Sequence, residues 1–184
     1  MKKSFIILFT SFLFLSFSNS FAQCDLPINE NGDYEFSEVV SVDGDPTKEQ
    51  LYGAAMIALS DAFKSSKDVI QSKDKDLGFV TGKFVTGPYP FSMGIWESKF
   101  NFSFRLDFKN GKYRITINYL GHEAYSSASS CSCPNDITKE KCGKSCVTKK
   151  QWNRQRCASH NDILNLVEVL EKKIIKNITT DSDW

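Results

Sequence analysis

The clearest pattern in the chain is an alternation of apolar and polar side chains over residues 100–109 and 113–119. Aromatic and branched residues occupy every second position of both runs, and polar residues lie between them. Asn110 and Gly111 connect the runs, and Asn-Gly is a preferred sequence for a two-residue type I′ turn. The alternation therefore predicts an antiparallel hairpin with one apolar face and one polar face.

A second pattern, with apolar residues three or four positions apart, predicts a helix over 47–64. Its apolar stripe is narrow and rich in alanine, which suggests close packing against a sheet. Thr47 and Gln50 have the spacing of a capping box at the start of this helix. Asp45, followed by Pro46, is the alternative cap.

Shorter patterns predict the remaining elements. Alternating apolar residues predict strands at 34–42, 69–71 and 79–85, and helical spacing predicts a last helix that begins near Asn161. The two prolines of the Gly-Pro-Tyr-Pro stretch at 87–90 exclude a central strand there.

These elements follow the order strand, helix, four strands, helix. The order favours an α+β fold in which a curved antiparallel sheet carries two helices on one face. Residues 121–158 lack apolar periodicity and contain five of the six cysteines. We therefore expect one α+β domain over 23–184, with a disulfide-rich insert at 121–158.

The first 22 residues have the features of a secretory signal peptide. Lys2 and Lys3 precede a mostly apolar run at 5–17, and small residues, Ser20 and Ala22, occupy the positions that signal peptidase requires. The apolar run is shorter than the roughly 20 residues that span a bilayer. Cleavage after Ala22 is therefore favoured over an uncleaved membrane anchor.

Export predicts a periplasmic or extracellular location, with no transmembrane span after cleavage. Lipoprotein anchoring through Cys24 is disfavoured, because the residue before it, Gln23, is not small. The composition, 41% hydrophobic and 24% charged, is that of a globular protein. Loss of the two lysines of the signal changes the formal charge from +1 to −1. Such a charge lacks the strong positive field of a general nucleic-acid binder, so we expect no nucleic-acid partner.

Short motifs between about Tyr34 and Gly121 together carry a family resemblance. Their positions are Phe36, Val40, Val42, Gly44, Leu51, Tyr52, Ala55, Val69, Ile70, Gln71, Gly78, Gly82, Lys83, Gly111, Lys112, Tyr113 and Arg114. With these motifs, the stretch resembles DUF4468, a bacterial secreted family of unknown function with a TBP-like fold. The resemblance implies the order β-α-β-β-β-β-α, which agrees with the patterns above, and it implies no catalytic residues. It does not cover the cysteine-rich insert.

The even number of cysteines, in an oxidising compartment, favours disulfides over a zinc site. Complete pairing requires a bond between Cys24 and the insert, and a bond between Cys131 and Cys133 is disfavoured by their spacing. The remaining connectivity is open. Zinc binding by the five cysteines of the insert and His160 is the less favoured alternative. The disulfide candidates are Cys24, Cys131, Cys133, Cys142, Cys146 and Cys157.

Two groups of polar and basic residues are candidate ligand contacts. A basic surface with an aromatic residue suits an anionic envelope component such as a lipid headgroup or an acidic glycan. The alternative is that these charges are solvated or balanced by the acidic segment 25–49. On the polar face of the hairpin the candidates are Arg105, Lys112, Arg114 and Asn118; in the insert they are Lys149, Lys150, Trp152, Arg154 and Arg156.

No catalytic motif accompanies these residues. His122 follows a predicted strand and His160 precedes the predicted last helix, without metal-binding or triad spacing. Ser72 and Lys75 have a nucleophile spacing but lack its partner motifs. We therefore expect no enzyme activity, no cofactor and no resident metal. The sequence favours an exported module that binds an anionic component or a protein of the bacterial envelope, and a structural or assembly role in the envelope is the alternative.

Overall fold

The computed structural model describes residues 24–63, 66–126, 129–133, 137–139 and 147–181. The predicted signal peptide lies outside the described residues, as do two of the disulfide candidates, Cys142 and Cys146.

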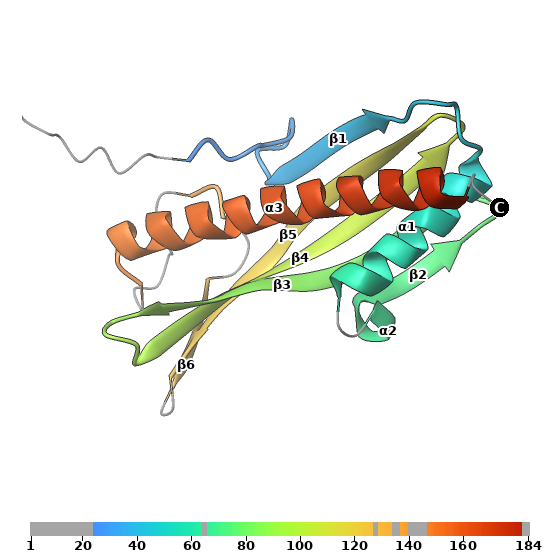
Figure 1. Ribbon diagram of the computed structural model, residues 1–184. Helices are drawn as coiled ribbons and strands as arrows, with labels where there is room; N and C mark the ends of the chain where they lie inside the picture. Colours follow the sequence, from blue (N-terminus) through green and yellow to red (C-terminus); the bar gives the residue numbers. More distant parts are fainter. Residues whose placement is uncertain (1–23, 64–65, 127–128, 134–136, 140–146, 182–184) are drawn as a thin grey trace, which may run out of the picture.

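An antiparallel sheet forms the centre of the molecule (Figure 1). In the described part of the chain it has six strands, in the order β1-β5-β4-β3-β2, and β6 pairs with the far end of β5. The strands are β1 (Glu35–Ser41), β2 (Ile70–Asp74), β3 (Phe79–Phe91), β4 (Trp96–Lys109), β5 (Lys112–Tyr125) and β6 (Ser130–Cys133).

The predicted hairpin is confirmed by the β4–β5 pair. Its register runs from Lys109 opposite Lys112 to Glu97 opposite Tyr125. Gly111, in the connecting turn, has φ +71°, a conformation that side chains with a Cβ rarely adopt. The apolar face forms the core of the molecule, where Phe100, Phe102, Leu106, Ile115 and Ile117 are fully buried.

Two helices, α1 (Lys48–Ala62) and α3 (Lys149–Asp181), cover one face of this sheet (Figure 1). A one-turn helix, α2 (Ser66–Val69), which the sequence did not indicate, leads into β2. The predicted α+β fold, with two helices on one face of an antiparallel sheet, is therefore confirmed. The opposite face of the sheet carries no helix among the described residues.

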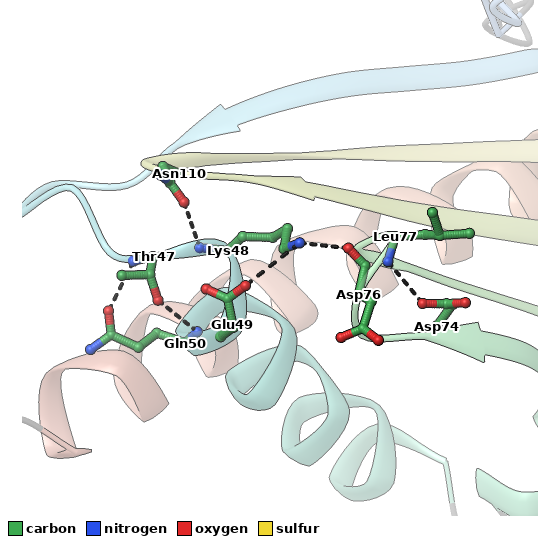
Figure 2. Close-up of polar contacts among 8 residues, drawn as sticks. All are labelled: Thr47, Lys48, Glu49, Gln50, Asp74, Asp76, Leu77 and Asn110. Atoms are coloured by element: carbon green, nitrogen blue, oxygen red, sulfur yellow. Dashed lines mark hydrogen bonds and ion pairs between the residues drawn. The ribbon is translucent and has the colours of Figure 1, made fainter.

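Helix α1 begins with the predicted capping box (Figure 2). The Gln50 N–H donates to Thr47 Oγ1 over 3.2 Å, and the Thr47 N–H donates to Gln50 Oε1 over 2.8 Å. The Lys48 N–H donates to Asn110 Oδ1, which joins the helix start to the hairpin turn. Thr47 is therefore the cap, and Asp45 is not. The buried stripe consists of Leu51, Ala54, Ala55, Ala58 and Leu59.

The predicted start of the last helix near Asn161 is wrong, because α3 begins at Lys149. Its first turn is fixed by a second capping pattern, in which the Gln151 N–H donates to Thr148 Oγ1 and the Thr148 N–H donates to Gln151 Oε1. The buried face of its first turns is largely polar, so no apolar periodicity marks it. The region 121–158 thus contains the end of β5, strand β6 and three turns of helix.

Strand β3 continues through the Gly-Pro-Tyr-Pro stretch to Phe91, with a cis peptide bond before Pro88 and a register shift between Thr86 and Tyr89. This stretch is still not a central strand. Strand β2 pairs only with residues 79–82 of β3, so the rest of β3 has one unpaired edge where prolines are tolerated.

A disulfide between Cys24 and Cys157 fastens the N-terminal segment to α3 across 133 positions of sequence. It confirms that Cys24 pairs with one of the other five cysteines. Its partner lies in a helix, however, and not in an irregular loop.

Replacing both cysteines by serine is expected to lower the free energy of unfolding by about 3–5 kcal/mol, because the bond closes a long loop in the unfolded chain. Urea denaturation of the wild-type protein and the double variant measures this difference. Peptide mapping without reductant should recover Cys24 linked to Cys157. A free or lipid-modified Cys24 would contradict this assignment.

Candidate functional site

The first turns of α3 hold the N-terminal segment against the sheet. Besides the disulfide, the Tyr34 hydroxyl lies 3.0 Å from His160 Nδ1 in a buried hydrogen bond. Burial raises the pKa of the Tyr34 hydroxyl, so the phenol stays protonated. The segment from Cys24 to Tyr34 is therefore fixed at both ends by α3.

The same turns of α3 also hold residues 137–139. Arg156 Nη1 donates to the carbonyl oxygens of Ile137, Thr138 and Lys139 at 3.0 to 3.2 Å. The Trp152 indole N–H donates to the Lys139 carbonyl over 2.8 Å.

These contacts correct two predicted ligand residues. Trp152 is 0% exposed and Arg156 is 3% exposed, so neither faces a ligand. They lie four positions apart on the buried side of a helix that the sequence did not predict, and there they bind the protein's own backbone. Lys149, Lys150 and Arg154 remain exposed on α3.

A cavity of about 300 Å³ lies where the fastened segments meet β5. The ladder between β1 and β5 ends at Asn118, and the ladder with β6 begins at His122, so the cavity lies between the two. One predicted residue, Asn118, is in its wall. The wall residues are Asn29, Asp33, Tyr34, Asn118, Tyr119, Leu120 and Ile137.

A second hollow, of about 130 Å³, contains two of the predicted basic residues, Lys112 and Arg114. We call it the basic hollow; its walls are Val39, Asp107, Lys109, Lys112, Tyr113 and Arg114.

The predicted residue Arg105 lies beside the basic hollow without lining it. Its Nη2 is 2.7 Å from Asp107 Oδ1, and its guanidinium lies 4.6 Å from the centre of the Phe79 ring. Hydrogen bonds to Asp107 raise the pKa of the Arg105 guanidinium. Arg105 thus engages the only carboxylate in the walls of the basic hollow.

Both histidines lie within elements and not at the predicted boundaries. His122, in β5, is 2% exposed and packs between the rings of Phe100 and Trp152, at centroid distances of 4.8 and 5.0 Å. Neither of its ring nitrogens has a hydrogen-bond partner among the described residues. Burial lowers the pKa of His122 to about 4. Burial also lowers the pKa of His160, in α3.

The zinc alternative loses one of its candidate ligands, because the sulfur of Cys157 is bonded to that of Cys24. Within the described ranges no three His, Cys, Asp or Glu residues are grouped as a metal site. Cys131 and Cys133 lie in β6, opposite Ala124 and His122.

The family model of the domain of unknown function DUF4468 with TBP-like fold matches residues 36–123. Residues 36–123 are a DUF4468 domain. This span includes α1 and nearly all of strands β1 to β5, together with every wall residue of the basic hollow. The N-terminal wall residues and Ile137 lie outside it, as does α3, which holds both wall segments in place.

Two crystal structures share the fold of the chain. A DUF4468 family protein from Bacteroides ovatus matches with a TM-score of 0.54 and 15% identity, covering 79% of this chain and 89% of that one. A TBP-like protein from Parabacteroides distasonis matches with a TM-score of 0.53 and 12% identity, covering 79% and 97%. No curated protein matches the chain. None of the helices in the described ranges is both long and apolar enough to cross a membrane.

Because His122 is buried, the stability of this protein should depend on pH. Its folded pKa of about 4 lies below the unfolded value of 6.5, so between these pH values the unfolded chain binds more protons. The stabilisation is complete above pH 6.5 and is lost as the pH falls towards 4, by about 3 kcal/mol in total.

The matched variant is His122→Phe, which keeps an aromatic ring in the cluster. Urea denaturation at about pH 7.5 and about pH 4 should show a smaller loss of stability for this variant than for the wild type. Equal losses for the two proteins would contradict the assignment.

Proposed function

We propose that the protein is an exported, non-catalytic binding module of the bacterial cell envelope, which binds an anionic group of an envelope component in the basic hollow. The signal-peptide pattern at residues 1–22 supports export. The observation that carries the proposal is the convergence of Lys109, Lys112 and Arg114 on one hollow whose only carboxylate is already held by Arg105.

The register of the hairpin brings two like charges together at this hollow, next to the complementary pair of Asp107 and Arg114. Lys109 lies directly opposite Lys112 at the end of the β4–β5 ladder, and like charges in that relation repel each other. Among the described residues, none forms an ion pair with Lys109, Lys112 or Arg114. An anion bound between them would relieve the repulsion.

The size of the hollow limits what enters it. Small-molecule sites span about 300–1,000 Å³, so about 130 Å³ suits one phosphate, sulfate or carboxylate group of a larger ligand. Arg114 offers a planar fork for two oxygens, and the lysines add point charges. Because these side chains border solvent, salt should weaken the binding.

The surroundings of the two histidines are consistent with a non-catalytic role. His122 is enclosed by aromatic rings, and His160 is hydrogen-bonded to Tyr34. Neither residue is a wall of the basic hollow.

The test compares two charge reversals on the polar face of the sheet. Arg114→Glu lies in the hollow, whereas Lys83→Glu makes the same charge change outside it, at a position paired with Ser103. We expect the wild type to bind phosphatidylglycerol vesicles or polygalacturonate at low salt. Arg114→Glu should weaken the binding about tenfold or more, as expected for loss of a charge-assisted contact.

Lys83→Glu should change the affinity by less than about twofold, because long-range effects of a single surface charge are screened. Equal weakening by the two variants would mean that only the overall charge matters. That outcome, or no binding of either anionic probe by the wild type, would overturn the proposal. The two probes distinguish a lipid headgroup from an acidic glycan.

A further inference from the structure

We propose that the cavity between the N-terminal segment, β5 and Ile137 binds the ammonium group of a small organic cation. This site is separate from the basic hollow and takes a ligand of the opposite charge.

The walls of the cavity are held in place before any ligand arrives. Asn29 Oδ1 accepts hydrogen bonds from the N–H groups of Asn31 and Asp33, both at 3.0 Å, which fixes the loop that carries Asp33. The disulfide of Cys24 and the Tyr34–His160 hydrogen bond anchor the flanks of this loop. A preformed cavity avoids much of the entropic cost of ordering a site on binding.

The opposite wall is tied to the same loop. Arg156 holds the backbone of residues 137–139, and Thr138 Oγ1 donates to the Gly32 carbonyl over 3.4 Å. Two wall segments that lie about a hundred positions apart in sequence are therefore joined on one side of β5.

The charge of the walls selects the sign of the ligand. Asp33 is the only charged wall residue, and no described residue forms an ion pair or hydrogen bond with its carboxylate. Glu30 and Glu35 are sequence neighbours of wall residues and add negative potential. An anion would be repelled here, whereas a cation would gain an ion pair.

The remaining walls suit an ammonium group attached to a short carbon chain. Tyr34 and Tyr119 supply aromatic rings, which attract cations, and the Tyr34 hydroxyl is already bonded to His160. Asn118, another wall residue, carries oxygen acceptors. Leu120 and Ile137 offer apolar contact to the carbon chain.

The volume of about 300 Å³ is at the lower end of small-molecule sites, so it fits an ammonium head with a few carbons. A primary amine, as on a lysine side chain, and a quaternary amine, as in a choline headgroup, share this chemistry. The experiment separates the two sources.

The test is an NMR titration of the ¹⁵N-labelled exported protein with n-butylammonium and with choline. 1-Butanol serves as the uncharged probe of matched length. We expect at least one cation to shift the amide resonances of Asp33, Asn118 and Leu120 saturably, and 1-butanol to have no such effect. The cation that binds more tightly identifies the class of amine.

Two variants of equal charge change complete the test. Asp33→Asn removes the carboxylate of the cavity and should weaken cation binding about tenfold or more. Glu30→Gln removes a neighbouring carboxylate that is not a wall residue and should weaken it by less than about threefold.

Three outcomes would overturn the proposal: no saturable shift with either cation, equal binding of 1-butanol, or unchanged affinity in Asp33→Asn. Arg114→Glu should bind the cations as the wild type does. The proposals for the two sites are therefore tested independently of each other.

Discussion

The first three turns of α3 hold together parts of the chain that are far apart in sequence. From this short stretch, Cys157 and His160 fasten the N-terminal segment, while Trp152 and Arg156 fasten residues 137–139. The sheet is held as well, because Ser159 Oγ lies 2.6 Å from Thr86 Oγ1 in β3 and the Ser98 hydroxyl of β4 donates to Gln155 Oε1 over 3.1 Å. The larger cavity exists because these anchors bring its walls to β5.

Sequence patterns predicted the elements whose cause is local. The Asn110-Gly111 turn, the alternating hairpin and the Thr47 capping box each depend on a few neighbouring residues, and each is present. The first turns of α3 were not predicted, because their buried face is largely polar and has no apolar stripe. The buried polar residues are Gln155, Arg156, Ser159 and His160. The groups that these side chains contact are distant in sequence, so the local pattern of apolar residues does not indicate the contacts. Thr148 and Gln151 repeat the capping pattern of α1 and would have given the helix start.

The same difference between local and distant causes decides which parts of the candidate sites could be predicted. Lys112 and Arg114 could be predicted as surface residues, because alternation in a hairpin fixes which side chains face away from the core, and both line the basic hollow. Trp152 and Arg156 were wrongly predicted to face a ligand, because the sequence patterns did not predict the helix that buries them. The cavity was not foreseen, since Asn29, Asp33 and Ile137 belong to no motif and meet β5 only through tertiary contacts.

The two sites also differ in their dependence on the DUF4468 domain. The basic hollow belongs wholly to it, whereas the cavity needs α3 and the N-terminal segment. If the first turns of α3 anchor the cavity, they must be as stable as the sheet. Native-state hydrogen exchange tests this directly: amides from Trp152 to His160 should exchange as slowly as those of Phe102 to Phe108, through global unfolding alone. If the helix amides exchange about a hundredfold or more faster than the strand amides, the first turns of α3 open separately from the sheet. That result would contradict their role as the anchor of the cavity.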